Sequence, residues 1–203
     1  MIRRLSNHCN AGHRARTFQA NEEETAIIRS LYLLTRKPIL YVANVGETEI
    51  THENRGELEQ RLAEFAEKEG NLAIRLCGKL EQDIAVLSDE EKTLFLEEYN
   101  LPEPGLHKLI HAGFRLLELE TFFTGGDKEV RAWTIKQGTT APEAAGEIHT
   151  DFQRGFIKAE VFKYDDLIRL GSEKAVKDNG LAKLQGKDYL VDDGDCIYFH
   201  FNV

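Results

Sequence analysis

The stretch LETFFTGGDKEVRAWT, residues 119–134, constrains the fold more than any other part of the sequence. Leu119, Thr121 and Phe123 alternate with residues that would face the other side of a strand, and residues 130–134 keep the same two-residue period. Gly125-Gly126-Asp127 separates the two runs and is typical of a hairpin turn. The sequence therefore predicts an antiparallel hairpin here.

The residues that follow the hairpin predict one helix and further strands. Residues 140–148 begin with Thr140 as a helix cap, and residues 157–162 are typical of a strand. Residues 188–203 predict two more strands, joined by a turn at 192–195. The order of hairpin, helix and strands favours a β-grasp (ubiquitin-like) domain over residues 118–203, an α+β fold.

In the first half of the chain, the pattern of apolar residues is typical of a different fold class, α/β. Ile39–Ala43 is an apolar run without polar alternation, which suits a strand buried on both faces. An amphipathic helix around residues 58–66 and a second strand at 72–76 would complete a βαβ unit. We therefore predict an α/β domain over residues 21–117, ending in helices from residue 81, after an irregular segment at 1–20. Capping boxes predict where two of its helices begin: Asn21 with Glu24, and Ser88 with Glu91.

Composition limits the classes of function. The chain has 203 residues, a net charge of −9 and three cysteines. The acid excess argues against DNA or other non-specific nucleic-acid binding, although residues 1–20 carry four arginines and no acid. The sequence has no run of 18 apolar residues, so it predicts no membrane span. The three cysteines are scattered along the chain, which suits a reducing, cytoplasmic setting.

The strongest local pattern follows the first predicted strand, in the sequence Asn44-Val45-Gly46-Glu47. Loops at the carboxyl ends of parallel strands are where α/β sheets bind ligands, and guanine-reading loops carry Asn-Lys-x-Asp there. Glu47 in place of Asp, and Val45 in place of Lys, would weaken the selection of guanine. Cys77-Gly78-Lys79 occupies the equivalent position after the second strand. A plain connecting loop is the alternative interpretation of both segments.

Two other kinds of site are not predicted. A phosphate loop needs Gly-x4-Gly-Lys-[Ser/Thr], but Gly78-Lys79 is followed by Leu80 and Gly186-Lys187 by Asp188. His107 and His111 have a zinc-compatible spacing without an evident third ligand, so we predict no metal site and no catalytic residue.

Several long strings resemble one family, the Obg-like, YchF-type ATPases, and the resemblance covers about residues 12–203. The matching segments are Ala15–Phe18, Pro38–Glu47, Glu103–Leu106, Phe122–Ile135, Ala141–Glu160, Gly186–Val191, Asp193–Asp195 and Phe201–Val203. The resemblance implies the end of a coiled-coil insertion, the last part of a P-loop-type nucleotide domain and a complete TGS domain. On this basis we expect a truncated form of the family's protein.

The resemblance also implies a ligand and site residues. It assigns ATP or GTP with Mg²⁺ as the cofactor of the intact family, with ATP preferred through the Asn-x-x-Glu loop, here Asn44 and Glu47. We expect base contacts from both loops, and only weak nucleotide binding by this chain. The predicted base-binding residues are Asn44, Val45, Glu47, Cys77, Gly78 and Lys79.

The family's TGS domain is associated with ribosome and RNA contact. We therefore expect a ribosome, RNA or protein partner for the second half of the chain. The candidate contact residues are Lys136, Arg154, Lys158 and Lys163, although a solvated face of mixed charge is an equally good interpretation. Two functions follow: a nucleotide-binding, ribosome-contacting protein that does not hydrolyse ATP alone, or an ATPase fragment completed by a separate phosphate-loop half.

Overall fold

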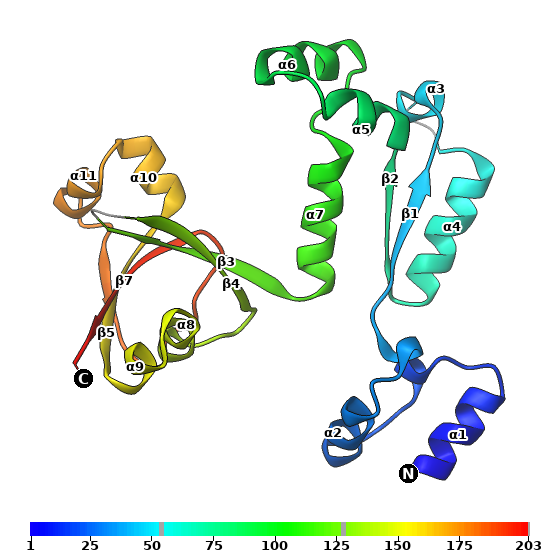
Figure 1. Cartoon of the computed structure of the whole chain (residues 1–203), viewed down its shortest axis with the longest axis horizontal. Helices are drawn as coiled ribbons and strands as arrows, with labels where there is room; N and C mark the ends of the chain where they lie inside the picture. Colours follow the sequence, from blue (N-terminus) through cyan, green and yellow to red (C-terminus); the bar gives the residue numbers. More distant parts are fainter. Residues whose placement is uncertain (53–54, 127–128, 203) are drawn as a thin grey trace. The chain divides into compact units, whose positions relative to one another are not determined.

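The computed structural model describes residues 1–52, 55–126 and 129–202 (Figure 1). The chain divides into two compact units, Met1–Leu116 and Leu117–Val203, and each is treated by itself. Both mix helices with strands. Within the described ranges, no helix is both long enough and apolar enough to cross a membrane.

The first unit contains a βαβ unit followed by three helices, as the sequence predicts. Asn21 and Ser88 each accept a hydrogen bond from the backbone amide three residues ahead, which confirms both capping boxes. The helices are α1 (Ile2–Asn10), α2 (Glu22–Ser30), α3 (Glu47–Ile50), α4 (Glu57–Lys68), α5 (Gly78–Ile84), α6 (Asp89–Glu98) and α7 (Gly105–Leu116). The strands are β1 (Leu40–Asn44) and β2 (Leu72–Leu76).

Strands β1 and β2 form a parallel pair in which Leu40 lies opposite Leu72 and Asn44 opposite Leu76. Figure 1 shows α4 on one side of this pair and α7 on the other. The ring of Tyr41 packs edge-on against Phe65 of α4, with ring centroids 5.8 Å apart. The register brings both strands to their carboxyl ends at the same level, so the loops that follow them are neighbours.

The prediction of an irregular segment at residues 1–20 is wrong. Ile2–Asn10 forms helix α1, and Ala15–Thr17 forms one turn of 3-10 helix. Leu5 is buried in a small cluster with Ala15 and Ile28 of α2, which stabilises a helix too short to persist alone. Leu5 is the one buried residue of α1, so the sequence shows little apolar periodicity there.

The second unit is a five-stranded mixed sheet in the order β4-β3-β7-β5-β6. Its central strand, β7, runs parallel to β3 and antiparallel to β5. The strands are β3 (Leu119–Gly125), β4 (Val130–Lys136), β5 (Phe156–Lys163), β6 (Lys183–Gln185) and β7 (Asp195–Phe201). The helices are α8 (Ala141–Ile148), α9 (Thr150–Arg154), α10 (Tyr164–Leu170) and α11 (Glu173–Asp178). The β3–β4 hairpin is confirmed; Asp127 of its predicted turn lies outside the described residues.

Helix α8 packs on one face of this sheet. Its buried face consists of alanines, including Ala144 and Ala145, which let the helix approach Phe122 of β3 closely. Thr140 and Glu143 form a capping box, and the hydrogen bonds that Thr140 donates lower the pKa of the Glu143 carboxyl. The predicted helix at 140–148 and its cap are therefore confirmed.

The end of the chain differs from the prediction. The described part of this segment, residues 188–202, contains one strand, β7, which begins at Asp195, the last residue of the expected turn. The segment before it pairs with the start of α8 through an isolated β-bridge between Leu190 and Thr140, and the Gly194 amide donates to the carbonyl of Thr121. Asp195 is fully buried, and the cost is offset because its carboxylate accepts hydrogen bonds from Tyr189 Oη and the Asp192 amide and pairs with Lys163. Helices α10 and α11 and strand β6 were not predicted.

Candidate functional site

The loops after β1 and β2 are joined by one side chain. Oδ1 of Asn44, at the end of β1, accepts a hydrogen bond of 2.9 Å from the backbone amide of Gly78. Gly78 is the first residue of α5 and follows Cys77, which is buried. The bond spans 34 residues of sequence, and it places two of the predicted base-binding residues in direct contact.

A second contact crosses the same pair of loops. The ammonium of Lys79 lies 2.7 Å from Oε1 of Glu47, the first residue of α3. The hydrogen bond to Glu47 and its negative charge raise the pKa of Lys79. Both side chains are solvent-accessible, and that of Lys79 is 68% exposed. The pair therefore presents an ammonium and a carboxylate side by side at the surface of the first unit.

Val45 and Cys77 support the two loops from the interior of the first unit. The amide of Val45 donates a hydrogen bond of 2.9 Å to the carbonyl of Leu76, which continues the strand pairing by one residue. The Val45 side chain packs against a buried cluster of Ile50, Cys77 and Leu80. All six predicted base-binding residues thus belong to one pair of adjoining loops, four as contacting polar groups and two as supports.

Glu81 is a further supporting residue, and its role was not predicted. Its two carboxylate oxygens accept hydrogen bonds from the amides of Gly105 and Leu106, at 2.7 and 2.9 Å, and so cap helix α7. A Cβ atom at position 105 would lie only 2.8 Å from Oε1 of Glu81 and 2.9 Å from Cβ of Leu76. Glycine is therefore required where α7 approaches β2. The partners are 24 residues apart, beyond the reach of a capping pattern.

The four candidate cations of the second unit do not gather on one surface. The ammonium of Lys136 donates to the carbonyl of Leu117, and Arg154 lies 3.7 Å from Asp151. Lys158 and Lys163 lie on opposite faces of β5, because they are five residues apart in a strand. The prediction of one contact region for all four is not supported by their placement.

Lys163 is paired with two carboxylates of its own unit, although its side chain is 45% exposed. Its ammonium lies 2.7 Å from the buried Asp195 and 3.1 Å from Asp192. Burial lowers the pKa of this amine, but the hydrogen bonds to both carboxylates outweigh it, and the net shift is upward. Burial and the hydrogen bond to Asp195 also raise the pKa of the Tyr189 hydroxyl. The cluster stabilises the start of β7.

Known proteins resemble this chain along most of its length. Residues 119–202 match the family model YchF-GTPase_C, described as a protein of unknown function (DUF933). The chain is 49% identical over 189 residues to a protein of Bacillus subtilis named ribosome-binding ATPase YchF, and 47% identical over 186 residues to Obg-like ATPase 1 of Rattus norvegicus. These matches cover 93% and 90% of this chain, and 52% and 46% of the relatives.

A solved structure gives the same result. The chain superposes on the Schizosaccharomyces pombe YchF GTPase with a TM-score of 0.82 and 31% identity, covering 98% of this chain and 53% of that one. The chain thus spans about half the length of the relatives it matches. We conclude that residues 119–202 are a YchF-GTPase_C domain, and that the chain is homologous to YchF-type, Obg-like ATPases over most of its own length.

Proposed function

We propose that this chain recognises the purine base of ATP at the loops after β1 and β2, and that its second unit contacts the ribosome. The hydrogen bond between Asn44 and Gly78 carries the first part, because it joins the two loops that the family resemblance assigns to the base. The relatives named ribosome-binding ATPase support the second part. In this proposal the β-grasp unit is the TGS domain.

The pairing of Glu47 with Lys79 supports a preference for adenine. A free carboxylate accepts two adjacent donors from guanine, which are its ring N–H and its exocyclic amine. Oε1 of Glu47 already binds the ammonium of Lys79, at 2.7 Å, so one of guanine's two donors would have to share that oxygen with a cation. Adenine presents a single exocyclic amine beside a ring nitrogen acceptor, so an ammonium and one carboxylate oxygen match its edge. Asn44 positions the backbone of Gly78 beside them.

We propose that the chain does not hydrolyse ATP alone. Most of the binding energy and electrostatic catalysis of phosphoryl transfer come from a phosphate loop and Mg²⁺. The residues described above fit a base but offer no cradle of amides for phosphates. Mg²⁺, when bound in the intact family's site, neutralises charge on the phosphates, and no residue of this chain is assigned to it.

A second candidate function is the base-reading part of an assembled ATPase. Among the described residues, β1 pairs with β2 alone, so its other edge is open, and the side chain of Val42 in mid-strand is 40% exposed. Parallel sheets are normally covered and extended on both sides, so this edge favours a further strand supplied by a phosphate-loop half.

One titration separates these functions. Labelled ATP with Mg²⁺ is added to the purified chain, and both binding and phosphate release are measured. We expect a dissociation constant of about 1 mM or weaker and no turnover, since base contacts alone contribute little affinity. Micromolar binding with turnover by the chain alone would overturn the proposal. Turnover that appears only when a phosphate-loop domain is added favours the second function.

A further inference from the structure

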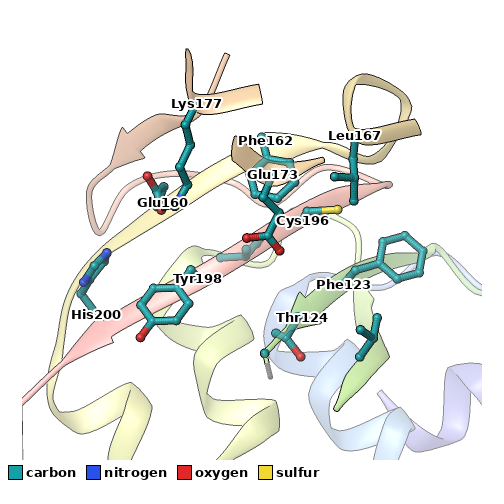
Figure 2. Close-up of a pocket in the computed structure, with 14 residues that line it drawn as sticks. Phe123, Thr124, Glu160, Phe162, Leu167, Glu173, Lys177, Cys196, Tyr198 and His200 are labelled. Atoms are coloured by element: carbon teal, nitrogen blue, oxygen red, sulfur yellow. Dashed lines mark hydrogen bonds and ion pairs between the residues drawn. The ribbon is translucent and has the colours of Figure 1, made fainter. Parts of the chain in front are cut away.

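A groove of about 800 Å³ crosses the face of the second unit's sheet that α8 leaves uncovered (Figure 2). Its floor is apolar and is formed by Phe123 of β3, Phe162 of β5 and Cys196 of β7, with Leu167 of α10 at one end. Val130 of β4 also lines the groove. With Glu173 and Lys177 of α11, the groove is built from six separate elements of one compact unit.

The register shows why this face is only half covered. Leu184, Glu160 and Tyr198 lie side by side across β6, β5 and β7, so they point to the same face as the groove. Helices α10 and α11 pack on Phe162 and Cys196 and leave the rest of this face uncovered. Val130 remains 79% exposed, Leu184 60% and Tyr198 58%. Large apolar and aromatic side chains are thus left in water beside a groove, which is typical of an interaction surface.

The charges that line the groove are mainly negative. The ammonium of Lys177 is bound to Glu160, at 2.7 Å, and this contact raises its pKa. Figure 2 shows the carboxylate of Glu173, the first residue of α11, pointing into the groove. Two carboxylates face one ammonium, so the groove repels phosphate and attracts a cationic side chain when His200 is neutral.

We propose that this groove binds a basic, amphipathic protein segment of the ribosome, and that the contact is made to protein and not to RNA. The inference rests on the proposed ribosome contact of the second unit. Apolar side chains of the segment, at helical spacing, fill the floor between Phe123 and Phe162, and one of its Lys or Arg residues pairs with Glu173. The ring of Tyr198 packs against the solvent-exposed side of the segment, as aromatic anchors do at interfaces.

Reversing the charge of Glu173 distinguishes a protein partner from an RNA partner, because the two predict opposite changes in ribosome binding. In cosedimentation of the full chain with purified ribosomes, Glu173→Lys should weaken binding about tenfold if its carboxylate meets a cation. The same substitution strengthens binding if the groove meets RNA phosphates. Glu147→Lys, an exposed site on α8 at the other face, makes the identical change in net charge and should leave binding unchanged. Val130→Asn tests the apolar lining of the groove at an exposed residue without changing the net charge, and it should also weaken binding.

A crosslink identifies the partner. The photoreactive p-benzoyl-phenylalanine is placed at Tyr198 in the groove, or at the exposed Ile157 of β5 as the control. We expect a ribosome-dependent adduct at position 198 that protease removes and ribonuclease does not, and none at 157. An RNA adduct at 198, stronger binding by Glu173→Lys, or unchanged binding by both groove variants overturns the inference. Failure of the unmodified chain to cosediment is separate, since it rejects the ribosome contact itself.

Discussion

The side-chain oxygen of Asn44 lies 2.9 Å from the backbone nitrogen of Gly78, and this bond fixes the end of β1 to the start of α5. Asn44 is exposed, so its amide group is used to hold the loops and not to fill the core. A base-reading surface made from two loops needs such a connection, because each loop alone would be free to move by more than a hydrogen-bond length.

Asn44→Ala should weaken both the loop connection and purine binding. Loss of a neutral hydrogen bond costs about 0.5–1.5 kcal/mol, and the Gly78 amide then turns to solvent. Amide hydrogen exchange at Gly78 should accelerate, and ATP affinity should fall by several-fold. Asn44→Asp keeps an acceptor at the same place and is the matched control. Equal exchange rates at Gly78 in the Ala variant and the parent chain would contradict the assigned role.

Two glycines of α7 should respond oppositely to alanine. Gly105→Ala forces a Cβ into Glu81 and Leu76, whereas a Cβ at Gly113 meets nothing within 4 Å. We expect Gly113→Ala to stabilise the first unit by about 0.5–1 kcal/mol through helix propensity. Gly105→Ala should instead lower its stability by about 1–3 kcal/mol. Denaturant unfolding of the two variants measures both, and the same sign for both would show that the close approach is not required.

Glu81→Ala should destabilise the same contact from the other side. Two amides at the start of α7 lose their carboxylate acceptor, and loss of a cap typically costs about 0.5–2 kcal/mol. Glu90→Ala, at an exposed position of α6, removes the same charge without removing a cap and is the control. A midpoint shift no larger than that of Glu90→Ala would reject the capping role.

The pair of Lys79 and Glu47 gives a pH dependence of known sign. The pKa of Lys79 is raised above its ordinary value of 10.5 in the folded chain. Its contribution to stability is therefore complete below pH 10.5 and is lost as pH rises through the folded pKa. Glu47→Gln should bring the Lys79 pKa back toward its ordinary value, as measured by NMR titration of the side chain. An unchanged pKa would mean that the ion pair does not form in solution.

Hydrogen exchange should separate the two units. β1 and β2 form a sheet of two strands, whereas β3, β5 and β7 share one buried core with α8. We expect amides of residues 36–80 to exchange faster than those of residues 121–203. Uniform protection would indicate that the open edge of β1 is covered by a further strand.

Local signals made much of the fold predictable. The caps at Asn21, Ser88 and Thr140 each act over three residues, so they can be recognised locally. The pattern of apolar residues in β1, β2 and the β3–β4 hairpin can also be recognised from the sequence alone. Elements fixed by distant contacts were missed. Helix α1 depends on the burial of Leu5 against residues far along the chain, and the helices α10 and α11 have only seven and six residues.

Some missed elements did leave a signal. Gly171 ends α10 in the left-handed conformation with φ 78°, and Ser172 caps α11 by accepting from the Ala175 amide. A glycine followed by a serine cap predicts one helix ending and another beginning. For the candidate site, the sequence and the resemblance identified the two loops. The contacts Asn44–Gly78 and Lys79–Glu47 could not be foreseen, because side-chain directions across a parallel pair depend on register.

The most direct test of the central claim is an NMR titration of the isotope-labelled chain with ATP and, separately, with GTP. The Gly78 amide and the Asn44 side-chain amide should shift with ATP at a dissociation constant of about 1 mM or weaker, while Gly113 in α7 stays unmoved. GTP should produce smaller shifts at the same concentrations. Shifts confined to other regions, or tighter binding of GTP at Gly78, would contradict adenine recognition by these two loops.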